Sequence, residues 1–387
     1  DSLAIPHNSN ISGGSAFSNL DFNGGPIDDS YASNRLLNEP LVEITQAKGT
    51  SETHPLISKN DEWASFETAT PSRYPSNQMK NIKGSYVRNA YLRGLAIEEK
   101  GIVNPYKFGL IGSSDSHVAG GSYNEETYFS KIGMIDGTPK LRGSVPFNKT
   151  FGFIISKISG SEEVAIDEIA NPMKYVDNNY YLNAGDRILY FGASGLAGVW
   201  AEENTRESIF AAFRKKETFA TSGPRIKVRF FGGYDLDNYN LSDENLIRKA
   251  YSLSTPMGGD IYTDNQMSPT FLIWTISDPL SNKLQRSQVV KGWVENGKHN
   301  EKVFDVVCSD GLKVDPTTHR CPDNGAEVNL NDCSTSENIG ASELKTFWKD
   351  PEFNSEINAF YYVRVLENPS CRWSTWDAVR NGEKPRS

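Results

Sequence analysis

Short apolar runs and helical patterns alternate along the first part of the chain. Residues 41–44 and 108–111 are apolar runs that end in polar segments, as is typical of strands. Between them, apolar side chains recur at helical spacing and predict an amphipathic helix around residues 80–100. A capping box formed by Asn204 and Glu207 predicts the start of a second helix. This alternation predicts an α/β architecture.

The pattern changes after residue 224. Alternating apolar and polar runs, separated by loops rich in Gly, Pro, Asn and Asp, predict a β-rich, sandwich-like domain. The predicted strands are residues 226–230, 271–276, 288–294, 303–307 and 360–366. A helical pattern occurs only near residues 341–348, and residues 238–264 and 309–337 are expected to form long surface loops. We therefore predict two domains, residues 1–224 and residues 225–387.

Composition narrows the class of protein. The 387 residues are 37% hydrophobic, enough for a sizeable core in two domains. A formal net charge of −9 argues against nucleic acid bound through a general basic surface. No run approaches the roughly 18 apolar residues that a membrane-spanning helix needs. The sequence thus predicts an acidic globular protein without a membrane span or a nucleic-acid partner.

The four cysteines all lie in the last fifth of the chain, at Cys308, Cys321, Cys333 and Cys371. Their number and wide spacing favour two disulfides over a zinc site, for which close pairs are typical. Of the three possible pairings we prefer Cys308–Cys321 with Cys333–Cys371. Disulfides indicate an oxidising compartment, so the periplasm or the outside of the cell is expected. Four unpaired thiols in a reducing cytosol are the alternative.

Three candidate metal ligands lie at or just after the ends of apolar runs. We expect residues 4–7 to form a strand that ends at His7, and Asp115 and His117 directly follow residues 108–111. Carboxylate and imidazole together suit Zn, Mn or Fe. The ends of parallel strands converge on one site in barrel-like folds, so Glu43 is a further candidate ligand. A turn-capping Asp beside a surface His, and an outward-facing Glu43, are the alternatives.

Glu52 and His54 follow residues 41–44 and would line the same mouth, although His54 is also a candidate for an ordinary loop histidine. The remaining His299 and His319 are expected at the surface. No nucleophile-elbow or phosphate-loop motif occurs, and the first part has no cysteine. A metal-activated water is therefore the favoured chemistry.

Several segments together resemble one bacterial family, which carries a domain of unknown function and is related to the PHP (polymerase and histidinol phosphatase) superfamily. The segments are residues 5–10, 41–44, 48–55, 104–117, 195–207, 217–226, 257–260, 290–293 and 360–367. The resemblance extends over nearly the whole chain.

The resemblance implies a distorted α/β barrel whose strand ends hold one to three divalent metal ions (Zn, Mn or Fe). His7 matches a strand-end histidine of the superfamily pattern, and Asp115 and His117 match its closing Asp-x-His pair. Glu43 falls on a strand that often carries an acidic residue. The superfamily opens with a His-x-His pair that this sequence lacks. The chain is therefore expected to be the C-terminal part of the barrel, completed by an N-terminal chain or segment of the same precursor.

The favoured function is a metal-dependent hydrolase, foremost a phosphoesterase, in which Arg206 and Arg225 are candidates for binding an anionic substrate. A carboxylic ester or amide hydrolase with the same metal site is an alternative. A binding or structural protein of the cell envelope, with a relict site, is a third possibility. The chain is also a candidate homo-oligomer.

Overall fold

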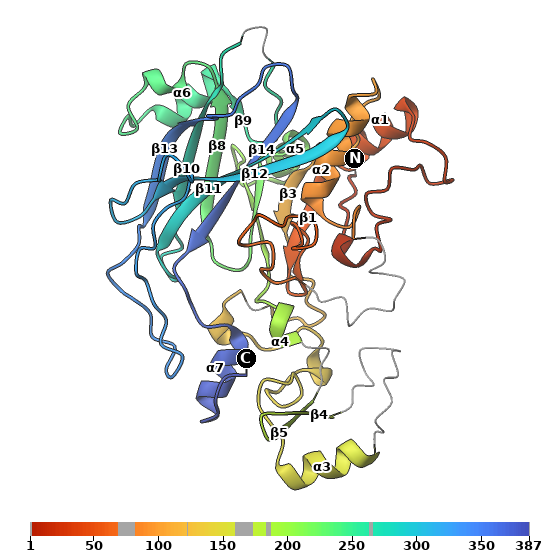
Figure 1. The fold of residues 1–387 in the computed structure, drawn as a ribbon, viewed down its shortest axis with the longest axis vertical. Coiled ribbons are helices and arrows are strands. Elements are labelled where there is room, and N and C mark those ends of the chain that lie inside the picture. Colours follow the sequence, from red (N-terminus) through yellow and green to blue (C-terminus); the bar gives the residue numbers. More distant parts are fainter. Residues whose placement is uncertain are drawn as a thin grey trace.

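The computed structural model describes residues 2–68, 82–121, 123–158, 173–182, 187–262 and 266–386. It is a mixed α/β structure built from several open sheets (Figure 1). The described strands form several open sheets and no closed barrel, and the partial PHP-type barrel implied by the resemblance stays a prediction.

A small sheet in the first part positions the candidate site. Its order is β2-β1-β3, with β1 and β3 parallel and β2 antiparallel to β1. The helices α1 and α2 cover one face of this sheet, where a buried core includes Phe17, Ala32, Val42, Ile44 and Ala90 (Figure 1). The elements are α1 (Asp29–Asn38), β1 (Leu41–Gln46), β2 (Gly49–Thr50), α2 (Val87–Glu98) and β3 (Gly109–Gly112). Both strands and the helix expected here are therefore present.

The segment before α1 differs from the prediction. Residues 4–7 are irregular and not a strand. Two backbone hydrogen bonds hold the segment in place, from the Ala4 N–H to the Asn38 carbonyl oxygen (2.7 Å) and from the Glu43 N–H to the Pro6 carbonyl oxygen (3.2 Å). The proline explains the difference, because it has no N–H to donate to a strand ladder. His7 nevertheless lies beside β1.

The rest of the first part contains short helices and two two-stranded sheets, β4-β5 and β6-β7, of which β4, β5, α3 and α4 are drawn below the small sheet in Figure 1. These elements are α3 (Lys149–Ile158), β4 (Met173–Val176), β5 (Asn179–Leu182), α4 (Arg187–Tyr190), β6 (Leu196–Val199), α5 (Arg206–Lys215) and β7 (Thr218–Thr221). The N-cap of α5 is Thr205, whose side chain accepts from the Ser208 N–H, so the expected capping by Asn204 is wrong by one residue.

Two antiparallel sheets dominate the second part. One has the order β13-β10-β8-β9 and the other the order β12-β11-β14. They pack face to face over a core that includes Phe271, Ile273, Val289 and Phe304, as a β-sandwich does. The strands are β8 (Lys227–Gly233), β9 (Thr255–Pro256), β10 (Thr270–Ile276), β11 (Leu284–Glu295), β12 (Lys298–Cys308), β13 (Glu343–Lys349) and β14 (Ala359–Glu367).

Two predictions about this part are wrong. The helical pattern near residues 341–348 belongs to strand β13, because pairing with β10 and burial of Leu344 outweigh the local spacing. The expected loop over residues 238–264 contains the helix α6 (Leu246–Leu253), which buries Leu246 and Ala250 against the sheet. A last helix, α7 (Trp373–Arg380), was not expected. It packs against the first part, where the Arg142 guanidinium donates to both oxygens of Asp377 at 2.6 Å.

All four cysteines are paired. Disulfides join Cys308 to Cys321 and Cys333 to Cys371, which is the preferred pairing. The first closes the loop that follows β12, and the second ties the loop before β13 to the segment before α7. Such bonds are typical of proteins from an oxidising environment. Among the described residues, no helix has the length and apolarity that a membrane span requires.

Candidate functional site

The site lies where the parallel strands β1 and β3 end. Their carboxyl ends meet at the same edge of the small sheet, as parallel strands require. A register shift after Glu43 bends β1 at this point. β3 ends at Gly112, where a side chain would collide with the Leu196 carbonyl oxygen, 2.5 Å from the position of a Cβ atom. The chain then turns through residues 113–117, which carry the predicted Asp-x-His pair.

Glu43 fixes the orientation of His7. The Glu43 side chain is 5% exposed, and its Oε2 atom lies 3.0 Å from His7 Nδ1. The other imidazole nitrogen, Nε2, lies 2.7 Å from Asn8 Nδ2, and Asn8 Oδ1 accepts from Gln46 Nε2 at 2.6 Å. Because the Gln46 contact makes the Asn8 amide nitrogen the donor toward His7, Nδ1 carries the imidazole proton. His7 Nε2 therefore has a lone pair, with which it accepts from Asn8.

Asp115 lies between two histidines. Its Oδ1 atom is 3.8 Å from His7 Nε2 and 3.4 Å from His117 Nε2. The Asp115 side chain is 14% exposed, whereas both histidines are about half exposed to solvent. Asp115 also adopts φ +45°, a left-handed conformation that is uncommon for a residue with a side chain and is enriched at functional sites.

Lys131 holds the second oxygen of Asp115. Its Nζ atom lies 2.5 Å from Asp115 Oδ2, and the Lys131 carbonyl oxygen accepts from the His117 N–H at 2.8 Å. Burial raises the pKa of Asp115, but the hydrogen bond and charge of Lys131, with smaller contributions from His7 and Lys48, lower it overall. Asp115 is therefore an ionised carboxylate at neutral pH.

The donor set suits a divalent ion in kind and, for one pair, in spacing. Two ligand atoms on a tetrahedral zinc ion lie roughly 3.3 Å apart, close to the 3.4 Å between Asp115 and His117 and below the 3.8 Å between Asp115 and His7. A carboxylate that orients a histidine through Nδ1, as Glu43 does, is common behind metal ligands. However, no group of three or more His, Cys, Asp or Glu side chains within the described ranges is arranged as a metal centre.

The other predicted site residues lie elsewhere. Glu52 is buried in an ion-pair network, with its Oε1 atom 2.6 Å from Arg88 and within hydrogen-bond distance of Tyr362. His54 is buried, packs against the Tyr86 ring at 5.5 Å and accepts from the Leu56 N–H. Burial lowers the pKa of His54.

Arg206 is the first residue of α5, and Arg225 follows the turn after β7. Both are exposed, and neither forms an ion pair with a described residue. The backbone N–H of Arg225 donates to Asp278, far along the chain. Neither arginine is therefore part of the cluster around Asp115.

Sequence reasoning missed Asn8, Ser113, Gln46 and Lys131. Ser113 donates a hydrogen bond to Glu43 Oε2. Asn8 adjoins His7, Ser113 follows the end of β3, and Gln46 lies three residues beyond Glu43, so polar residues close to recognised positions were the available signal. Lys131 lies sixteen positions beyond Asp115 in an irregular segment, and no spacing pattern indicates it.

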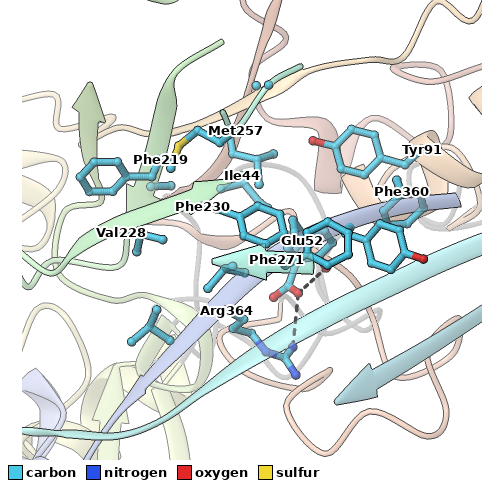
Figure 2. Close-up of a pocket in the computed structure, with 18 of the residues that line it drawn as sticks. Ile44, Glu52, Tyr91, Phe219, Val228, Phe230, Met257, Phe271, Phe360 and Arg364 are labelled. Atoms are coloured by element: carbon cyan, nitrogen blue, oxygen red, sulfur yellow. Dashed lines mark hydrogen bonds and ion pairs between the residues drawn. The ribbon is translucent and has the colours of Figure 1, made fainter. Parts of the chain in front are cut away.

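A large cavity lies between the first part and the sandwich. Its volume is about 1210 Å³, and its walls come from α2, β3 and β7 on one side and from β8 and β14 on the other. Figure 2 shows its mostly apolar lining, which includes Ile44, Phe219, Val228, Phe230, Met257, Phe271 and Phe360. None of His7, Glu43, Asp115 and His117 lines this cavity. The cavity is thus separate from the cluster around Asp115.

Comparison with known proteins gives one match. The family model described as "Protein of unknown function (DUF3604)" matches residues 1–387. No curated protein and no solved structure matches the chain. The domain of unknown function expected from the sequence is therefore confirmed, whereas the relation to the PHP superfamily stays a prediction. Since the family model covers the whole sequence, the chain belongs to the DUF3604 family of proteins of unknown function.

Proposed function

We propose that the protein is a metal-dependent hydrolase whose centre is the cluster of His7, Asp115 and His117. The observation that carries the proposal is the position of Asp115 Oδ1, which lies within 4 Å of the Nε2 atoms of both histidines. Two imidazoles facing one ionised carboxylate, at the ends of two parallel strands, form a donor set for Zn, Mn or Fe.

Each residue has a distinct task in this proposal. His7, Asp115 and His117 would hold one to three divalent ions, and Glu43 keeps the His7 lone pair directed away from β1. A bound ion supplies an activated water at neutral pH. Lys131 keeps Asp115 ionised and brings positive charge to the mouth of the site.

We favour a phosphate ester as the substrate, because residues 104–117 resemble the Asp-x-His segment of the PHP superfamily. A carboxylic ester or amide is the alternative that the same activated water would attack. With two disulfides in the second part, we place the protein in the periplasm or outside the cell.

The test is hydrolysis by the purified protein with added Mn or Zn. The substrates are 4-nitrophenyl phosphate, bis(4-nitrophenyl) phosphate and 4-nitrophenyl acetate. We expect metal-dependent hydrolysis of a phosphate ester and a loss of about 100-fold or more in His117→Gln. The matched control is His299→Gln, because His299 is also exposed and lies in the sandwich. Equal activity of the two variants would refute the assignment.

One observation favours a second candidate, an envelope binding protein with a relict site. The Lys131 ammonium already pairs with Asp115 at 2.5 Å and so supplies a positive charge where a metal ion would bind. In that case Lys131→Met would destabilise the protein and create no new metal affinity. If Lys131 instead competes with a metal ion for Asp115, the same variant binds Mn or Zn more tightly than the wild type.

A further inference from the structure

The wall of the cavity between the two parts contains a partly buried lysine, Lys216. Lys216 lines the cavity together with Gly109, Phe219, Met257 and Gly258. Lys216 has no side-chain hydrogen bond or ion pair with any residue that the structure describes. A partly buried ammonium without such a contact gains from a nearby anion, because burial disfavours its charged form.

Two glycines, Gly109 and Gly258, pack closely against the Cβ atom of Lys216. At Gly109, the position of a Cβ atom lies 2.7 Å from Lys216 Cβ, and at Gly258 it lies 2.5 Å away. Neither position therefore tolerates a side chain, and the two glycines hold the Lys216 stem between them. Lys216 also ends α5 with φ +62°, a left-handed conformation for which Gly is the usual residue. A lysine in this position costs stability, and such strain is concentrated at functional positions.

The nearest acid is already engaged. Asp260 lies 3.2 Å from Lys107 Nζ, and Glu98 lies 3.4 Å from the same ammonium. Burial lowers the pKa of Lys216, the charge of Asp260 raises it and that of Lys107 lowers it, with a net lowering. An anion arriving in the cavity would reverse this shift and gain the attraction that Asp260 supplies only in part.

Aromatic side chains form much of the cavity wall. Figure 2 shows Phe219, Phe230 and Phe271 among its lining residues, together with Met257. Aromatic rings favour edge-to-face and offset contacts with other rings, and Met sulfur also packs well against them. These groups fit a flat ring system better than a flexible chain, because a rigid ligand loses less conformational freedom on binding.

We propose that this cavity is a second binding site, which takes an aromatic monoanion with its rings against Phe219 and Phe230 and its acidic group on Lys216. The site is separate from the proposed hydrolytic cluster, none of whose residues lines the cavity. It shares no residue with that cluster, so its test needs no metal ion.

The experiment is isothermal titration calorimetry of the full chain in the presence of a chelator. The probes are 2-naphthoate, its neutral analogue 2-naphthalenemethanol, and decanoate as an aliphatic anion. The proteins are the wild type, Lys216→Met, Lys216→Arg and Lys215→Met. Lys215 is the matched control because it is the adjacent residue and is exposed. Thermal unfolding of each variant shows whether it is folded.

We expect the wild type and Lys215→Met to bind 2-naphthoate about tenfold more tightly than 2-naphthalenemethanol. Lys216→Met should lose that difference by weakening naphthoate alone, and Lys216→Arg should keep most of it. The wild-type comparison of acid and alcohol decides the question even if Lys216→Met does not fold. Equal affinity for acid and alcohol, no binding of naphthoate, or tighter binding of decanoate would overturn the proposal.

Discussion

Two glutamates, Glu67 and Glu367, have a pKa above that of an exposed glutamate because burial disfavours their charged form. Burial raises the pKa of Glu67 to about 7, with Arg372 opposing the shift and Glu125 adding to it. Burial likewise raises the pKa of Glu367 to about 7. A carboxyl group whose pKa is raised on folding stabilises the protein at low pH, and this contribution is lost as the pH rises through the folded pKa. The stability contributed by these two glutamates is therefore lost between about pH 4.5 and pH 7.

The variant Glu67→Gln tests whether the pKa of Glu67 is raised in the folded protein. Since glutamine stays neutral, the variant should gain stability relative to the wild type as the pH rises from 5 to 8, by about 3 kcal/mol at most. The measurement is the thermal midpoint of both proteins across this range. Glu327→Gln is the control because Glu327 is exposed. A difference between Glu67→Gln and the wild type that does not change with pH would contradict the raised pKa.

At the scale of elements, a buried ion-pair network joins α2 to the sandwich. Arg88 on α2 lies 2.8 Å from Asp61 Oδ2, and Arg364 on β14 lies 2.7 Å from Asp61 Oδ1. Glu52 contacts both arginines. Burial raises the pKa of Asp61 and Glu52, but the two guanidinium groups lower it overall, so both carboxylates stay charged. The loop after β2 is thereby fastened to two elements far apart in sequence.

Removal of one of the two arginines should therefore destabilise the protein. Arg88→Met leaves two buried carboxylates with a single guanidinium, and we expect it to lower the free energy of unfolding by about 3–5 kcal/mol. Arg206→Met, at the exposed start of α5, should change it by about 0.5 kcal/mol or less. Urea unfolding at neutral pH measures both. A loss below about 1 kcal/mol in Arg88→Met would show that the network contributes little.

The two disulfides restrict loops of different length. The bond from Cys333 to Cys371 spans 38 residues, and that from Cys308 to Cys321 spans 13. Loop-closure entropy predicts a cost of about 4 kcal/mol for removing the longer link and about 3 kcal/mol for the shorter. Denaturant unfolding of the two double Cys→Ser variants compares them. A larger loss from the shorter link would show that native-state effects outweigh the entropy of the unfolded chain.

At the scale of the whole molecule, the sequence predicted the sandwich better than the first part. The strands of the sandwich are short apolar runs bounded by polar loops, as residues 271–276 are, and β10 is buried over most of its length. β13 was misread because its pairing partner, not its own pattern, decides its conformation. The apolar spacing of Leu246 and Ala250 was a usable signal for α6, but the polar residues around it outweighed it.

The candidate site was predictable only in part. His7, Glu43, Asp115 and His117 do lie together, because the ends of parallel β1 and β3 share one edge. Glu52 instead forms ion pairs with Arg88 and Arg364, and local spacing in the sequence predicts neither partner. The pairing of Lys131 with Asp115 and the cavity beside Lys216 arise from tertiary contacts alone.

The proposed function rests on one claim, that the cluster around Asp115 binds a divalent ion. The most direct measurement is the metal content of the purified protein after loading with Mn or Zn and removal of free metal. We predict at least about one ion per chain in the wild type and in His299→Gln, and a loss of about tenfold or more in Asp115→Asn. A wild type that retains no metal, or an Asp115→Asn variant that retains as much, would contradict the claim.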